Sequence, residues 1–173
     1  GGEHEPFPVH HDGGRIQVND GKLFLNGSML ISGASEVLFD SGEFHLAGDD
    51  THVLVSDEAR LAFSHGGLFH FEQTYVAQHV LRATGQARVE LNGTEIDCDA
   101  ATITIQLYDD ASYSATGTSS KDWSTWYMYD RSSLSLQWVM NGGDVLFYDA
   151  VTIDVRNTVG IMPWLYFPAG SVA

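Results

Sequence analysis

The stretch that decides the fold is Glu36-Val-Leu-Phe-Asp-Ser-Gly42, because its pattern recurs along the chain at lengthening intervals. A charged residue comes first, two apolar residues follow two positions apart, and a polar corner ends in glycine. This alternation is typical of a half-buried β-strand that runs into a turn. Three further stretches share the pattern: Arg15-Ile-Gln-Val-Asn-Asp-Gly21, Arg60-Leu-Ala-Phe-Ser-His-Gly66 and Arg88-Val-Glu-Leu-Asn-Gly93.

Two more strand-like segments follow each of these stretches, always in the same order. The second segments are Lys22-Leu-Phe-Leu25, Glu43-Phe-His-Leu46, Leu68-Phe-His-Phe71 and Thr94-Glu-Ile-Asp97. The third segments are residues 29–31, 53–55, 75–81 and 103–107. A unit of three strands that repeats in this way is typical of a solenoid. We therefore expect an all-β chain that folds as a parallel β-helix, or β-solenoid, of about five short right-handed coils.

An antiparallel β-sandwich, a jelly roll or an interlocked fibre is the alternative fold. Asn26-Gly27, Asn92-Gly93 and Asn141-Gly142 are typical of type I′ turns in antiparallel hairpins. That alternative does not explain why three strand types recur in fixed order with glycine at the same corner. Residues 73–85 fit both a helix and a strand, and the strand is favoured because Tyr75, Ala77, His79 and Leu81 recur at every second position.

The chain divides into five segments by composition. Residues 1–13 have no periodicity and form an extended arm, and residues 14–108 hold the regular coils. Residues 109–132 begin with a run of Asp, Ser, Thr and Gly and continue into an aromatic segment, so we expect an inserted loop there. Residues 133–157 repeat the order of the strands and form a final coil. Residues 158–173 are an apolar tail.

Charge excludes some partners. The 173 residues include 23 acidic and 8 basic side chains, which gives a formal charge of −15. Such a field repels phosphate backbones, so we expect no nucleic acid as a partner. Cys98 is the single cysteine and lies between Asp97 and Asp99, where a reactive thiolate is disfavoured. We expect no membrane span, because the chain has no apolar run of the length, about 18 residues or more, that a spanning helix needs.

Histidines and acids suggest metal sites of modest specificity. If the coils stack in register, His45 and His70 lie about 4.8 Å apart on one outward column, where they suit a transition metal or a pH switch. His4, His10 and His11 form a second cluster in the N-terminal arm. Calcium is a further candidate at the acidic corners, namely Asp49-Asp50, Asp97, Asp99 and Asp109-Asp110. The alternatives without a metal are that the histidines form an ordinary surface column and that the acids accept hydrogen bonds from nearby backbone NH groups.

Aromatic residues are densest after the inserted loop. We expect Trp123, Trp126, Tyr127, Tyr129 and Trp138 to contact a glycan or a partner, or to cap the end of the stack. The tail is too apolar to be left in water, so it packs on its own stack or docks into another copy. Its candidate assembly residues are Ile161, Met162, Trp164, Leu165, Tyr166 and Phe167.

Residues 14–108 and 133–157 resemble, in architecture alone, the β-helical shaft and head modules of phage tail fibres and spikes and of bacterial surface adhesins. The resemblance implies a rigid, non-catalytic, oligomeric part and assigns no functional residue. We therefore expect a structural or adhesive protein of a virion surface, tail fibre or extracellular appendage that assembles through its terminal segments and needs no cofactor. A carbohydrate-binding module that uses the aromatic patch is the first alternative. A small metal-dependent or polysaccharide-active enzyme is the second, although nothing singles out a catalytic pair among the acidic residues and no familiar catalytic motif occurs.

Overall fold

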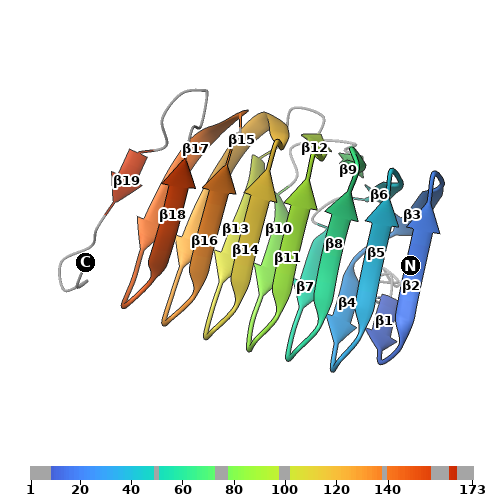
Figure 1. The fold of residues 1–173 in the computed structure, drawn as a ribbon, viewed down its shortest axis with the longest axis horizontal. Coiled ribbons are helices and arrows are strands. Elements are labelled where there is room, and N and C mark those ends of the chain that lie inside the picture. The colour runs from blue at the N-terminus through green and yellow to red at the C-terminus, as the bar shows by residue number, and fades with distance from the viewer. Residues whose placement is uncertain are drawn as a thin grey trace, which may run out of the picture.

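The computed structural model of the chain describes residues 9–48, 51–72, 78–97, 102–137, 140–156 and 164–166. Every regular element in these ranges is a β-strand, and every strand pair is parallel. The strands wind into a stack of coils (Figure 1), which confirms the β-solenoid and excludes the antiparallel alternative for the described part. No helix there is long and apolar enough to cross a membrane.

The first strand of each coil lies in a seven-stranded sheet, here called the first-strand sheet. Its strands run side by side across Figure 1, from the blue N-terminal end to the orange C-terminal end. They are β2 (Arg15–Asn19), β5 (Glu36–Asp40), β8 (Arg60–Ser64), β11 (Arg88–Asn92), β14 (Ser112–Thr116), β16 (Ser133–Gln137) and β18 (Thr152–Arg156).

The second and third strands form two ladders of one larger sheet. The second ladder contains β3 (Lys22–Asn26), β6 (Glu43–Ala47), β9 (Leu68–Glu72) and β12 (Glu95–Asp97). The third contains β1 (Val9–Asp12), β4 (Met29–Ser32), β7 (His52–Val55), β10 (Gln78–Ala83), β13 (Thr102–Leu107) and β19 (Trp164–Tyr166). Two long strands, β15 (Ser119–Met128) and β17 (Met140–Phe147), pass through both ladders and join them.

The pairing of neighbouring strands confirms that the recurring sequence stretches occupy equivalent positions in successive coils. Arg15 pairs with Glu36, Glu36 with Arg60, and Arg60 with Arg88. The lengthening intervals between these residues in the sequence are therefore true coil lengths.

Beyond β11 the coils become shorter again. Arg88 pairs with Ser112, Ser112 with Ser133, and Ser133 with Thr152, so each successive coil uses less chain than the one before. The longest coils thus lie in the middle of the stack, and the coils at its two ends are of similar size.

Alternate side chains of each strand point inward and stack on their equivalents in the next coil. The rings of Phe39 and Phe63 lie 4.6 Å apart and nearly parallel, and those of Phe44 and Phe69 lie 5.4 Å apart. All four side chains are at most 2% exposed. Burial of one such side chain contributes about 1.5–3 kcal/mol, so these inward columns stabilise neighbouring coils against one another.

Aspartates and glycines shape the corner that follows the third strand. Asp57 and Asp109 have left-handed backbones, with φ of 61° and 57°. Each carboxylate accepts a hydrogen bond from a backbone NH of the preceding coil, Asp57 from Gly33 at 3.0 Å and Asp109 from Gly85 at 2.9 Å. Gly85 itself has φ of 70°, and a Cβ there would lie 3.1 Å from the backbone of Asp57. These acids thus link one coil to the next.

The predicted structure is wrong for two of the five segments, residues 109–132 and residues 133–157. Residues 112–116 are not part of an inserted loop, because they form β14, which pairs with β11 and β16 in the first-strand sheet. β15 likewise belongs to the regular ladders. Residues 133–157 do not form one final coil, because β18 pairs with β16 in the first-strand sheet and so begins a further coil. Short, hydroxyl-rich strands such as β14 have few large apolar residues, which made them resemble a loop.

Residues 78–83 form β10, so the strand expected near this position is confirmed over the described residues. β10 pairs in parallel with β7 and β13, which excludes a helix at residues 78–83. Residues 73–77, which include Tyr75, lie outside the described residues.

Candidate functional site

The N-terminal end of the stack leaves inward-facing side chains partly open. β2 and β3 are the outermost strands of their ladders, so one edge of each has no strand partner among the described residues. Their inward residues are only partly buried, although they pack against the core: Ile16, Val18, Leu23 and Leu25. The equivalent residues one coil further in are at most 1% exposed: Val37, Phe39, Phe44 and Leu46.

The C-terminal end of the first-strand sheet is open in the same way. β18 is the last strand of that sheet, and its inward residues pair with the buried Leu134 and Leu136. Ile153 is partly buried, and Val155 is 46% exposed. Val155 lies in an inward column and is still half exposed, because no further strand of the described residues covers it. Its apolar surface therefore remains free to pack against another element.

Part of the apolar tail packs on the chain's own stack. Trp164, Leu165 and Tyr166 form β19, which pairs in parallel with residues 144–146 of β17. This segment therefore extends the third ladder, which is the first of the two roles expected for the tail. The other candidate assembly residues, Ile161, Met162 and Phe167, lie outside the described residues.

Trp126 is not a surface contact residue, which corrects the expectation for the aromatic patch. Its side chain is 3% exposed and belongs to the core cluster. The indole Nε1 donates a hydrogen bond to Oγ of Ser124 at 2.8 Å, and its ring meets Tyr113 edge-on at 4.8 Å. Trp126 points inward because it pairs with the inward Ile105 of β13. The side chains of Trp123 and Trp138 lie outside the described residues.

Tyr129 belongs to a column of three tyrosines at a corner of the solenoid. Its ring lies 4.5 Å from that of Tyr108 and 4.7 Å from that of Tyr148, with interplanar angles of 2° and 8°. The guanidinium carbon of Arg82 lies 5.8 Å from the centroid of Tyr108. Burial, the neighbouring phenols and the hydrogen bond with Tyr108 together raise the pKa of Tyr129. Both faces of Tyr129 are thus covered by rings, so a sugar cannot stack on it.

The tyrosine column was not predicted for Tyr108 and Tyr148, although the sequence contains a pattern that indicates it. The dipeptide Tyr-Asp occurs at 108–109, 129–130 and 148–149, each time directly after an apolar third strand. Tyr127 is the remaining aromatic candidate. It is half-buried on the outer side of β15, paired with Gln106 of β13 and Leu146 of β17.

His45 and His70 lie on one outward column, as the register predicted. Phe24 pairs with His45, His45 with His70, and His70 with Asp97. The two imidazole rings are 5.1 Å apart, and the side chains are 14% and 16% exposed. Nδ1 of His70 lies 4.0 Å from Oδ2 of Asp97.

Glu43 joins this column to the N-terminal end of the stack. Its Oε2 lies 2.8 Å from Nζ of Lys22 and 2.6 Å from Nε2 of His45. The hydrogen bond from Lys22 and that from His45 lower the pKa of Glu43, with burial opposing them. Among the described residues no group of three or more His, Cys, Asp or Glu side chains is arranged to hold a metal ion. Metal or calcium binding stays a prediction.

The histidines of the N-terminal arm do not converge where the structure describes them. His10 and His11 are neighbours in β1, so their side chains leave opposite faces of the strand. Nε2 of His10 lies 2.8 Å from Oγ of Ser32, whereas His11 pairs with the buried Ile31. His4 lies outside the described residues.

No family model, no curated protein and no solved structure matches the chain.

Proposed function

We propose that this chain is a non-catalytic structural and adhesive protein, a stiff module of a virion surface, tail fibre or extracellular appendage that assembles with copies of itself end to end. The proposal rests on the partial burial of inward apolar side chains at the two ends of the stack. Inward apolar side chains are open at β2 and β3 on one end and at Val155 of β18 on the other. A solenoid needs its terminal coils capped or continued.

The ladders of parallel strands continue through the described part of the chain, and this continuity supports the proposal that the module is rigid. Each coil pairs with its neighbours by parallel strands, and the inward columns are continuous from Val37 in β5 to Leu134 in β16. Because every coil packs on the next, bending requires the loss of both hydrogen bonds and core contacts. Stiffness of this kind suits a spacer or a display scaffold.

The side chains at the two ends favour head-to-tail continuation. If the first-strand sheet runs on from one copy to the next, Thr152 lies beside Arg15, Asp154 beside Gln17, and Arg156 beside Asn19. None of these pairs places like charges together. A head-to-head contact would instead set the two copies of β2 antiparallel, so the parallel ladder would not continue from copy to copy. The coils at the two ends are also similar in length, so their outlines match.

The formal charge of −15 supports specific rather than general association. Like-charged copies repel one another, so their outer faces do not favour contact. Contact at the ends is favoured because apolar area is buried there while the acidic faces stay in solvent. An acidic surface is also compatible with solubility in salty, extracellular surroundings.

The test is sedimentation velocity over a range of protein concentrations, with wild type and Val155→Lys. Lysine at this half-exposed end position should block burial of the end, so the variant should shift from oligomer to monomer. Ser135→Lys is the matched control, because Ser135 is exposed on the outer side of the neighbouring strand β16. A wild-type chain that remains monomeric at all concentrations would refute the assembly proposal.

A further inference from the structure

A groove crosses the outer face of the first-strand sheet, on the side opposite the core. It has a volume of about 510 Å³ and touches five successive strands, from β2 to β14. With neighbouring strands about 4.8 Å apart, it runs about 19 Å along the stack. Its outward-facing lining residues extend from Arg15 and Gln17 of β2 to Ser114 and Thr116 of β14.

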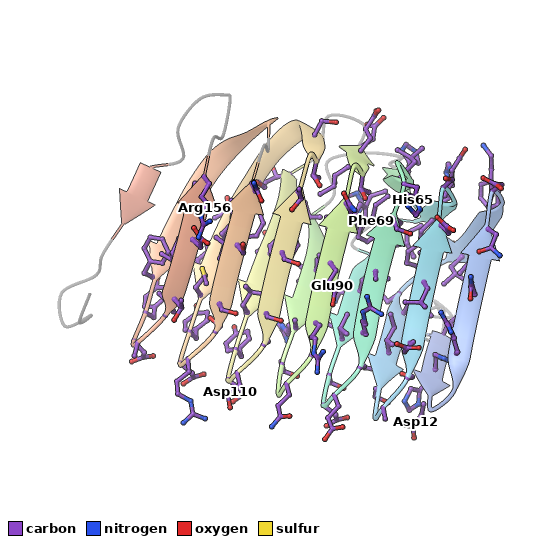
Figure 2. All side chains as sticks on the ribbon, in the orientation of Figure 1. Asp12, His65, Phe69, Glu90, Asp110 and Arg156 are labelled. Atoms are coloured by element: carbon purple, nitrogen blue, oxygen red, sulfur yellow. The ribbon has the colours of Figure 1, made fainter. Side chains whose placement is uncertain are left out.

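The groove exists because of one small residue in the middle row of the sheet. Ala62 pairs with Leu38 on one side and Glu90 on the other, so its methyl group lies between two much longer side chains. Figure 2 shows Glu90 on the outer face of β11. Ala62 is 8% exposed although it points away from the core. It forms an apolar floor together with Leu38, which is half-buried.

One wall of the groove is held in place by ion pairs. Nη2 and Nε of Arg60 donate to the two carboxylate oxygens of Glu90 at 2.7 and 3.1 Å. Nη1 of the same arginine lies 3.5 Å from Glu36, whose other oxygen lies 3.7 Å from Arg15. The hydrogen bonds with Glu90 are the largest cause of the raised pKa of Arg60. A bidentate pair of this kind fixes both side chains before any ligand arrives.

The other wall is polar, and part of it remains available for a ligand. Oδ1 of Asp40 already lies 3.2 Å from Oγ of Ser64 and 2.6 Å from Nδ1 of His65. The side chains of Asn92, Ser114 and Thr116 make no hydrogen bond to any residue that the structure describes. Amide and hydroxyl groups act as both donors and acceptors, as sugar hydroxyls do.

We propose that this groove binds a neutral, linear polysaccharide along the axis of the stack. A polymer of sugar rings repeats at a length comparable to the strand spacing, so successive rings meet equivalent positions of successive coils. The apolar floor suits the C–H faces of the rings, and the walls supply planar polar partners. The volume lies within the range of about 300–1,000 Å³ that is usual for ligand sites.

Charge decides between neutral and anionic polymers. Arg15 and Arg60 are the cations that line the groove, and both are already paired with carboxylates. Asp40 and Glu90 line the same groove, and the whole chain carries −15. An anionic polysaccharide therefore meets repulsion that the paired arginines do not offset. The inference rests on the adhesive part of the proposed function and names its ligand class, but it does not depend on end-to-end assembly.

The test is isothermal titration calorimetry with defined oligosaccharides. The probes are the hexamers and trimers of β-1,4-linked glucose, mannose, xylose and N-acetylglucosamine, with a hexamer of galacturonic acid as the anionic comparison. Wild type should bind at least one neutral hexamer, and bind it more tightly than its trimer. Ala62→Leu should fill the floor and weaken this binding by about tenfold or more. Ser135→Leu, three strands further along the same outward row, should bind as wild type does.

If Ala62→Leu loses its β-sheet circular dichroism, Asn92→Ala replaces it, with Gln137→Ala as the matched control in the same row. Absence of binding to every neutral hexamer overturns the inference, as does unchanged binding by the groove variant or binding of the acidic hexamer alone. Sedimentation of the same samples reports assembly separately, so either proposal can fail while the other stands.

Discussion

At the residue scale, single polar side chains hold neighbouring coils together from outside the core. Asp109 reaches back to the NH of Gly85, and Arg131 forms a two-pronged ion pair with Asp110 at 2.7 Å for both contacts. Figure 2 shows Asp110 at the corner of the stack. On the second ladder, Glu43 bridges Lys22 and His45. Exposed ion pairs each contribute little, about 0–1 kcal/mol, so these contacts fix register more than they stabilise the fold.

The lowered pKa of Glu43 makes its contribution to stability depend on pH. A carboxylate whose pKa is lower in the folded state stabilises the protein above its unfolded pKa. That stability is lost as the pH falls below the ordinary value of 4.5 and through the lowered folded value. Glu43→Gln should therefore be less stable than wild type at pH 7, by about 1 kcal/mol or less. The two proteins should become equally stable near the lower end of the acid range.

Urea denaturation at both ends of this pH range measures the difference. Glu58→Gln is the control, because Glu58 is exposed and has no ion pair with another described residue. A difference between wild type and Glu43→Gln that persists unchanged into acid would show that the carboxylate charge is not its source.

At the element scale, the order and register of the strands could be predicted where large apolar residues mark them. The stretches beginning at Arg15, Glu36, Arg60 and Arg88 pair as expected, and so do His45 and His70. Prediction failed for β14, where inward positions hold Tyr113 and Ala115 among serines and threonines. Its strand character depends on pairing with β11 and β16, which is a tertiary effect that local composition does not report.

The candidate site was less predictable than the fold, again for reasons of pairing. Trp126 was expected to contact a glycan or a partner, or to cap the stack, yet its place opposite Ile105 turns it into the core. The groove depends on the contrast between Ala62 and its cross-strand neighbours, which becomes visible only when three coils are aligned. Long-range register therefore decides which side chains face solvent together.

Two phenylalanines on the second ladder allow the stability contribution of an inward side chain to be compared with that of an outward one. Phe69 is fully buried between coils, so Phe69→Ala should cost about 3–5 kcal/mol of unfolding free energy. Phe24 is 62% exposed and stacks on His45, so Phe24→Ala should cost about 1 kcal/mol or less. Urea unfolding followed by tryptophan fluorescence gives both values. Similar losses for the two variants would contradict the inward and outward assignments of this ladder.

At the scale of the whole molecule, the described residues form a short rod. Inward apolar side chains at both of its ends are only partly buried, and the outer face of the first-strand sheet carries a groove. The coils lengthen from β2 toward β11 and shorten again toward β18, so the ends are the narrow parts of the stack. Head-to-tail contact would continue the outward rows of the first-strand sheet, and with them the direction of the groove, from copy to copy. Assembly and polysaccharide binding would then act together, because many weak sites on one filament bind with high avidity.

The most direct test of the account is the distance between spin labels at the two ends of one outward row. Gln17→Cys and Asp154→Cys, in a Cys98→Ser background, lie six strand spacings apart in the first-strand sheet. The account predicts an intramolecular distance of about 29 Å by double electron–electron resonance. Continuous-wave spectra of the same samples should show strong spin–spin broadening between position 154 of one copy and position 17 of the next, and this broadening should disappear when labelled protein is diluted with unlabelled protein. An intramolecular distance far from about 29 Å would contradict the continuous stack, and absence of the broadening at high concentration would contradict its continuation between copies.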